Sequence, residues 1–152
     1  MISKGPTLTR KLYVLNGPNL DMLGQREPEI YGTTTLADIQ ASVERLASEF
    51  GFELFFAQTN AEHQMIEWLH DAFRDAAAVV INPAGFSFQS VPVLDALRML
   101  RVPLVELHIS NIHARDIVHR HSLVSAVATA VIAGAGSFGY DLAVRAAHAL
   151  ST

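Results

Sequence analysis

The sequence predicts an α/β fold with a doubly wound, five-stranded parallel sheet and helices on both of its faces, because strand-like and helix-like segments alternate along the whole chain. The strand-like runs are almost entirely apolar, as expected for strands that are covered on both faces. Right-handed crossovers between parallel strands distribute the helices over the two faces. Five strands within 152 residues favour a flavodoxin-like strand order.

The first half of the chain contains two expected strands and one expected helix. Residues 12–15 form a short apolar run, which we expect to be the first strand. Residues 16–34 are rich in Gly, Pro and Asn and have no helical period, so a long loop is expected there. A helix should follow, with Thr35 as its N-cap and Asp38 completing a capping box, and Gly51 should end it. The second strand is expected at residues 52–57.

The second half repeats this pattern of strands and helices. The expected helices cover residues 60 or 61 to 74, 91–100 and 137–150, and the expected strands cover residues 78–81, 104–107 and 128–133. Pro92 falls in the first turn of its helix, where a missing N–H is tolerated. The segments after the third and fourth strands are rich in polar and turn-forming residues, so we expect loops there, with at most a short helix in the latter.

The composition excludes several classes of protein. Half of the residues are hydrophobic and 17% are charged, which is too apolar for a disordered chain, and a net charge of −4 argues against a non-specific nucleic-acid binder. No apolar run reaches the roughly 20 residues that a membrane-spanning helix needs. The sequence has no cysteine, which leaves no disulfide framework and fits a cytoplasmic protein. We expect residues 1–10 to be a flexible tail and residues 11–152 to be a single domain.

Two polar stretches follow predicted strands, where open parallel sheets bind their ligands. In the first, Asn-Gly-Pro-Asn-Leu at residues 16–20, Asn19 can donate and accept hydrogen bonds, although Asn-Gly also marks an ordinary turn with a positive φ. In the second, Glu106 and His108 alternate on a strand and so point to one face, where the carboxylate could fix the tautomer of an acidic histidine. A hydrogen-bonded structural pair is the alternative. The N–H groups and the Ser110 hydroxyl that follow could hold a carboxylate or simply form a turn.

The long loop at residues 16–34 carries a candidate general base. A tyrosine has a pKa of about 10, and a nearby guanidinium favours the ionised form and lowers that pKa. Tyr31, five residues after Arg26, could therefore accept a proton in a reaction. The alternative is a solvated arginine and a tyrosine that packs.

Two further patterns point to ligands more weakly. His113, His119 and His121 lie close in sequence, but their spacing matches no zinc motif, so we expect no metal site. Residues 134–139 match the pattern G-x-G-x-x-G between a predicted strand and a predicted helix. A dinucleotide site also needs an acidic residue after a second strand about 20 residues further on. The sequence stops at Thr152, so we expect these glycines to serve close helix–sheet packing.

Taken together, these stretches resemble type II 3-dehydroquinate dehydratases over residues 12–150. The motifs that carry the resemblance are long and in the order of the family: Asn16-Gly17-Pro18-Asn19-Leu20, Arg26-Glu27-Pro28, Tyr31-Gly32, and the run from Glu106 to Arg115. The resemblance implies a flavodoxin-like fold and a homododecamer that is a tetramer of trimers. It also implies anti elimination of water from 3-dehydroquinate, giving 3-dehydroshikimate, without a metal or cofactor.

The resemblance implies a catalytic role for each of several residues. Tyr31 matches the base that removes a proton from C2, with its pKa lowered by Arg26 and Arg115. Asn19 matches a residue that stabilises the enolate through a bridging water. His108 matches the acid that protonates the leaving C1 hydroxyl, with Glu106 beside it.

The resemblance also implies contacts to the substrate. Asn82, Ile109 and Ser110 match such contacts, and the last two hold the substrate carboxylate. Asp95 matches a residue that reaches the site of a neighbouring subunit, and the loop that carries the base matches a mobile lid.

Two positions depart from the pattern of the family. The loop after the third strand usually reads Asn-Pro-Gly-Ala-Tyr-Thr-His-Thr-Ser, whereas residues 82–90 read Asn-Pro-Ala-Gly-Phe-Ser-Phe-Gln-Ser. Phe88 therefore stands where a substrate-contacting histidine is expected, and His119 stands where an arginine is expected. Both positions serve the hydroxyl side of the substrate ring, and a hydroxyl left unpaired there would carry a penalty.

The sequence therefore leaves several functions open. The first is a lyase that dehydrates 3-dehydroquinate, and the second is a paralogue that acts on a related cyclic hydroxy ketone. The third is a catalytically silent domain that binds a carboxylate. The fourth is a nucleotide-binding module, which the incomplete glycine fingerprint disfavours.

Overall fold

The computed structural model describes the backbone of residues 9–152 and their side chains except those of Ile30 and Tyr31. Five parallel strands form one sheet in the order β2-β1-β3-β4-β5. This order confirms the predicted flavodoxin-like α/β fold. The strands are β1 (Arg10–Asn16), β2 (Phe52–Gln58), β3 (Ala76–Asn82), β4 (Leu104–His108) and β5 (Ala130–Ala133).

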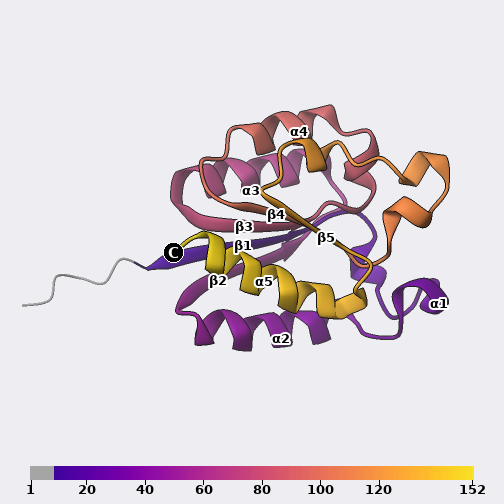
Figure 1. Ribbon diagram of the computed structural model, residues 1–152, viewed down its shortest axis with the longest axis horizontal. Helices are drawn as coiled ribbons and strands as arrows, with labels where there is room; N and C mark the ends of the chain where they lie inside the picture. Colours follow the sequence, from indigo (N-terminus) through magenta and orange to yellow (C-terminus); the bar gives the residue numbers. More distant parts are fainter. Residues whose placement is uncertain (1–8) are drawn as a thin grey trace, which may run out of the picture.

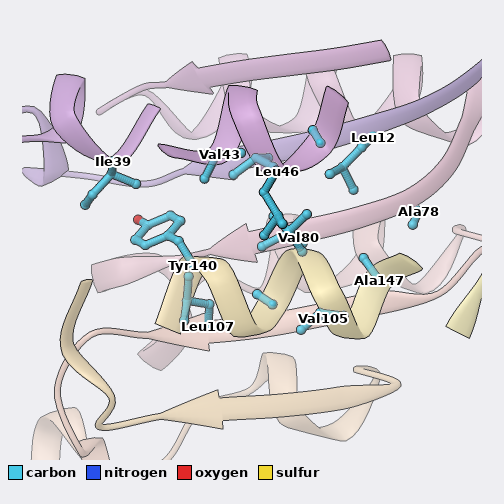
Figure 2. Close-up of a cluster of buried hydrophobic side chains, with 14 of the residues drawn as sticks. Leu12, Ile39, Val43, Leu46, Ala78, Val80, Val105, Leu107, Tyr140 and Ala147 are labelled. Atoms are coloured by element: carbon cyan, nitrogen blue, oxygen red, sulfur yellow. The ribbon is translucent and has the colours of Figure 1, made fainter. Parts of the chain in front are cut away.

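Helices cover both faces of the sheet (Figure 1). One face carries α2 (Leu36–Glu49) and α5 (Gly139–Leu150), and the other carries α3 (Glu62–Asp75) and α4 (Val91–Arg98). Successive residues of β1 alternate between the two cores. Leu12 and Val14 lie in the core beneath α2 and α5, part of which Figure 2 shows, whereas Tyr13 and Leu15 lie in the opposite core. This alternation explains why the central strands are apolar throughout.

The predicted start of α2 is confirmed. The Thr35 hydroxyl accepts a hydrogen bond from the Asp38 N–H at 3.1 Å, and the Asp38 carboxylate accepts one from the Thr35 N–H at 3.0 Å. These reciprocal bonds satisfy two N–H groups that the helix itself leaves unpaired. Gly51, which follows the end of α2, has a φ of +77°, a conformation that glycine adopts without strain.

Several expectations about element boundaries were wrong. β3 begins two residues earlier than expected, at Ala76, and α4 ends two residues earlier, at Arg98. The long loop contains two single-turn helices, a 3-10 turn at Leu20–Met22 and α1 (Pro28–Tyr31), which are too short to show an apolar period. The fifth strand begins two residues later than expected, because the N–H groups of residues 127 and 128 bond to the Val124 carbonyl in a turn. The last helix begins at Gly139, after a 3-10 turn at Gly136–Phe138.

Two of the three glycines at residues 134–139 lie close against neighbouring groups, as expected for a packing role. A Cβ on Gly139 would lie 2.7 Å from Cδ1 of the buried Leu107, so a larger residue where α5 approaches β4 would force that side chain to shift. Gly134 has a φ of +90° and lies against Asn111. Both glycines therefore have a structural role that needs no nucleotide.

β1 begins at Arg10, which was expected to lie in the tail. Arg10 pairs with Phe52 of β2, and its guanidinium donates to the Ser151 hydroxyl at 2.6 Å. The rest of the expected tail, residues 1–8, lies outside the described residues. Within residues 9–152, no helix is long and apolar enough to cross a membrane.

Candidate active site

A cavity lies at the carboxyl edge of the sheet, where β1, β3 and β4 end. It brings together segments that are far apart in the sequence, as expected for an open parallel sheet. The cavity is lined by nine of the predicted site residues: Asn19, Arg26, Asn82, Phe88, His108, Ile109, Ser110, Arg115 and His119.

Two predicted residues whose side chains the structure describes, Glu106 and Asp95, are not part of this lining. Glu106 is fully buried behind His108 and does not reach the cavity surface. Asp95 lies on the exposed side of α4, away from the cavity of its own chain. Tyr31 ends α1, and its side chain lies outside the described residues.

Several lining residues were not predicted to lie in the site. Apolar side chains from Leu20, Leu23 and Ile112 form part of the wall, together with Ala84 and Gly85. Leu20 and Ile112 belong to motifs that the sequence singled out, but an apolar residue within a polar motif gave no separate signal. Leu23 had no signal, because nothing in its local sequence distinguishes it from a core leucine.

The predicted pair of Glu106 and His108 is present. The His108 Nε2 atom makes a short hydrogen bond with Oε2 of Glu106, and both side chains are buried. The Ser125 hydroxyl donates to the other carboxylate oxygen at 2.6 Å. Burial alone would raise the pKa of Glu106, but the hydrogen bonds from His108 and Ser125 lower it below its usual value. The Ser122 hydroxyl contributes to this lowering by proximity, without the geometry of a full hydrogen bond.

This arrangement decides which nitrogen of His108 serves a ligand. Because Nε2 is engaged with the carboxylate, a molecule in the cavity can use only Nδ1. An ionised Glu106 accepts the Nε2 proton and stabilises a positive charge on the ring. His108 can therefore donate a proton into the cavity from Nδ1 and recover it afterwards.

The two departures from the family pattern meet in this cavity. The Phe88 ring lies against the His108 ring, with centroids 6.4 Å apart and planes 30° apart. It also makes an edge contact with His119, at 5.3 Å and 80°. The His119 Nδ1 atom lies 2.7 Å from Oδ1 of Asp116, and this hydrogen bond lowers the pKa of the Asp116 carboxyl. One wall of the cavity is therefore aromatic.

Asn82, which lines the cavity, belongs to a buried hydrogen-bond network that the sequence did not predict. The Tyr140 hydroxyl, from the first turn of α5, donates to the Asn16 side chain at 2.6 Å and accepts from the Asn82 side chain at 3.0 Å. Burial raises the pKa of Tyr140, so the hydroxyl stays neutral and can donate. The Asn82 oxygen accepts from the Ala84 N–H at 3.3 Å. The Asn82 side chain, expected to contact substrate, is thus held by protein groups while it lines the cavity.

The turn after β1 is shaped by close approach. A Cβ on Gly17 would lie 2.4 Å from the Pro83 carbonyl oxygen, and the φ of Gly17 is not positive. The positive φ that an Asn-Gly turn would suggest for this loop is therefore not at Gly17. Asn19 adopts that conformation instead, with a φ of +69°, and its N–H donates to the Asn60 side chain at 2.9 Å. These contacts fix the backbone that presents Asn19 to the cavity.

The loop that carries Arg26 leaves and rejoins the fold at glycines. Gly24 has a φ of +87°, and a Cβ there would lie 2.8 Å from the Thr33 carbonyl oxygen. Gly32 has a φ of +77° and open space around it. The base of the loop is thus tightly packed on one side and open on the other. Arg26 lines the cavity, with its guanidinium 3.8 Å from the Glu27 carboxylate.

The charge of the cavity favours an anionic ligand. Arg26 and Arg115 lie in its wall together with His108 and His119, and none of the described lining residues is acidic. The Ser110 hydroxyl and the strand-end backbone of β4 add neutral polar groups. Such a set suits a carboxylate on a polar ring. Among the described residues, no three His, Cys, Asp or Glu side chains are grouped to hold a metal ion.

Comparisons with known proteins agree with this geometry. A family model described as "Dehydroquinase class II" matches residues 10–148. A 3-dehydroquinate dehydratase from Kineococcus radiotolerans is 55% identical over 135 residues, which are 89% of this chain and 92% of that protein. One from Salinispora arenicola is 56% identical over 134 residues, 88% of this chain and 94% of that protein. The crystal structure of type II dehydroquinase from Propionibacterium acnes superposes with a TM-score of 0.89 at 45% identity, covering 93% of this chain and 98% of that one.

Proposed function

The chain belongs to the class II dehydroquinase family, and we propose that it dehydrates 3-dehydroquinate to 3-dehydroshikimate. The observation that carries the proposal is the His108–Glu106 pair at the wall of a cavity that contains two arginines and no described acidic residue. This combination supplies a proton donor and an anchor for a carboxylate in one site.

In the proposed reaction, Tyr31 takes the proton from C2 and His108 gives a proton to the hydroxyl on C1. The electrons of the C2–H bond move into the C3 carbonyl and form an enolate, which collapses with loss of the C1–O bond. Water leaves, and a conjugated enone remains. Arg26 and Arg115 line the cavity, and their charge would lower the pKa of Tyr31 so that it acts as the base.

The remaining residues are proposed to bind and stabilise. The strand-end backbone at Ile109 and Ser110 would hold the carboxylate of the substrate, beside the Asn82 side chain. Asn19 would stabilise the enolate through a bridging water, since its backbone is fixed by the contact to Asn60. A loop closed over the site would exclude water.

Assembly is also proposed rather than observed. Asp95 lies on the exposed side of α4 and outside the cavity of its own chain. This position suits a residue that reaches a neighbouring subunit's site in a tetramer of trimers. Light scattering of the purified protein tests the dodecamer. The expectations of a cytoplasmic location and of activity without a cofactor stay predictions.

Enone formation from 3-dehydroquinate, followed by ultraviolet absorbance, tests the proposed activity. We expect turnover by the wild type and a loss of at least ~10²-fold in kcat for His108→Ala. His113→Ala is the matched control, because His113 is exposed and does not line the cavity. Absence of turnover in a folded wild-type protein would contradict the proposal.

One observation favours a second candidate, a paralogue that acts on a related cyclic hydroxy ketone. Phe88 and His119 form an aromatic wall where the family places polar contacts to ring hydroxyls. If specificity has shifted, wild-type kcat/KM for 3-dehydroquinate is low, and the double substitution Phe88→His and His119→Arg raises it. Each recovered hydrogen bond is worth about 1–3 kcal/mol, so the gain is ~10² or more.

Two results would refute this second candidate. One is a wild-type enzyme that is already efficient on 3-dehydroquinate. The other is a double variant that gains equally on substrates with and without both ring hydroxyls, because the change would then act on the order of the loop. Binding of cyclic carboxylates without turnover of any of them would instead favour a silent binding domain.

A further inference from the structure

Glu106 is a buried carboxylate with two hydrogen-bonded oxygens. Oε2 is bonded to His108, and Oε1 accepts from the Ser125 hydroxyl at 2.6 Å. A buried carboxylate holds its charge and its orientation only while hydrogen-bond donors satisfy it. Rotation of Glu106 about its terminal torsion would break both bonds together, so Ser125 helps to keep Oε2 on the histidine.

The turn that carries Ser125 is itself held in place. Ser125 lies in a 3-10 turn at Val124–Ala126, and the Val124 side chain is buried in the core beside α3 and α4. Just before the turn, the Leu123 N–H donates to the Ser87 carbonyl at 2.7 Å. Just after it, Thr129 exchanges two hydrogen bonds with Leu104 at the start of β4, at 2.7 and 3.0 Å. Anchors on both sides fix the Ser125 hydroxyl relative to β4.

Ser125 is an exposed residue that does not line the cavity. A substitution there can therefore reach the chemistry only through Glu106. We propose that Ser125 is a positioning residue of this enzyme, which orients Glu106 and through it keeps Nδ1 of His108 directed at the substrate. This inference rests on the proposed function of His108 as the acid.

The experiment compares Ser125→Ala, Ser125→Thr and the wild type in two measurements. The first is kcat and KM for 3-dehydroquinate. We expect kcat to fall about 10-fold in Ser125→Ala with KM nearly unchanged, and the hydroxyl of Ser125→Thr to restore most of it. The second is carbon NMR of the Glu106 carboxyl, assigned with Glu106→Gln. Loss of a donor to the ionised form should raise the pKa of Glu106 by about 1 in Ser125→Ala, and Ser125→Thr should reverse the change.

Ser42→Ala is the matched control, because it removes an exposed serine hydroxyl that accepts a side-chain hydrogen bond from Arg45 on α2 and does not touch Glu106. It should leave kcat and the carboxyl titration unchanged. Wild-type kcat and an unmoved titration in Ser125→Ala would overturn the inference while leaving the dehydratase in place. If the wild type lacks turnover, the proposed function fails, and the titration alone decides whether Ser125 holds Glu106.

Discussion

Ala84 and Gly85 stand in the inverse order from the one usual in the family, and the structure shows a cost of this inversion. Ala84 has a φ of +50°, a conformation that residues with a Cβ rarely adopt. Gly85 has no such φ, and no atom lies within 4 Å of a Cβ built on it. The alanine therefore occupies the position that needs a glycine, and the glycine occupies one that does not. We expect the double substitution Ala84→Gly and Gly85→Ala to stabilise the protein.

The magnitude follows from three contributions to the free energy of unfolding. Relief of the left-handed conformation at Ala84 is worth about 1–2 kcal/mol. The added freedom of a glycine in the unfolded chain, with the lost packing of a half-buried methyl group, offsets much of that gain. Gly85→Ala returns about 0.4–1 kcal/mol by restricting the unfolded chain. The sum is a gain of about 1 kcal/mol, or roughly 2–4 °C in Tm.

Urea and thermal unfolding of the two single variants and the double variant measure this gain. Gly51→Ala is the matched control, because Gly51 has the same open surroundings as Gly85 but a φ of +77°. It should lower the free energy of unfolding by about 1 kcal/mol. A double variant less stable than the wild type, or a Gly51→Ala variant as stable as Gly85→Ala, would refute the reasoning from backbone conformation.

Four further predictions concern the site. Tyr31→Phe should lower kcat by at least ~10²-fold with the fold kept, as judged by circular dichroism; near-normal kcat would remove Tyr31 from the mechanism. Activity should survive dialysis against a chelator, and activity lost and then restored by a metal ion would contradict this. Gly17→Ala should lower the free energy of unfolding by about 1–3 kcal/mol, because its Cβ would meet the Pro83 carbonyl oxygen at 2.4 Å. The pKa of Glu106 is lowered in the folded protein, so its stabilising contribution is present above about pH 4.3 and is lost as the pH falls through the folded pKa. In Glu106→Gln, the free energy of unfolding, measured by urea titration, should therefore fall less steeply as the pH is lowered. An unchanged dependence of that free energy on pH would contradict this prediction.

The fold could be predicted because its signals are local. Apolar runs, capping residues and helical spacing each lie within a few residues, and the capping box at Thr35 is present as expected. The single-turn helices near residues 20 and 28 could not be predicted, because one turn is too short to show a period. The start of β5 depends on a turn in which the N–H groups of residues 127 and 128 bond back to the Val124 carbonyl, and the sequence does not reveal this turn.

The site could be predicted in outline but not in its supports. Glu106 and His108 were expected to share a face because residues two apart in a strand do so, and they are hydrogen bonded. Ser125 and Tyr140 were missed because they come from later elements that only the folded chain brings near. The close approach of Gly17 to the Pro83 carbonyl could not be predicted, since contact with another loop cannot be read from a local turn pattern.

The bonds of Tyr140 to Asn16 and Asn82 have a consequence for how the protein folds during synthesis. The bond from Tyr140 to Asn16 joins residues 124 apart in the sequence, so the ends of β1 and β3 emerge from the ribosome long before their partner does. Until α5 is made, the side chains of Asn16 and Asn82 lack their Tyr140 partner and must hydrogen bond to water instead. Burying them before then would leave polar groups unpaired, which is unfavourable. Assembly of the catalytic edge is therefore a late event, tied to docking of the last helix. A nascent chain stalled before residue 140 should protect its first strands from hydrogen exchange while leaving this edge open.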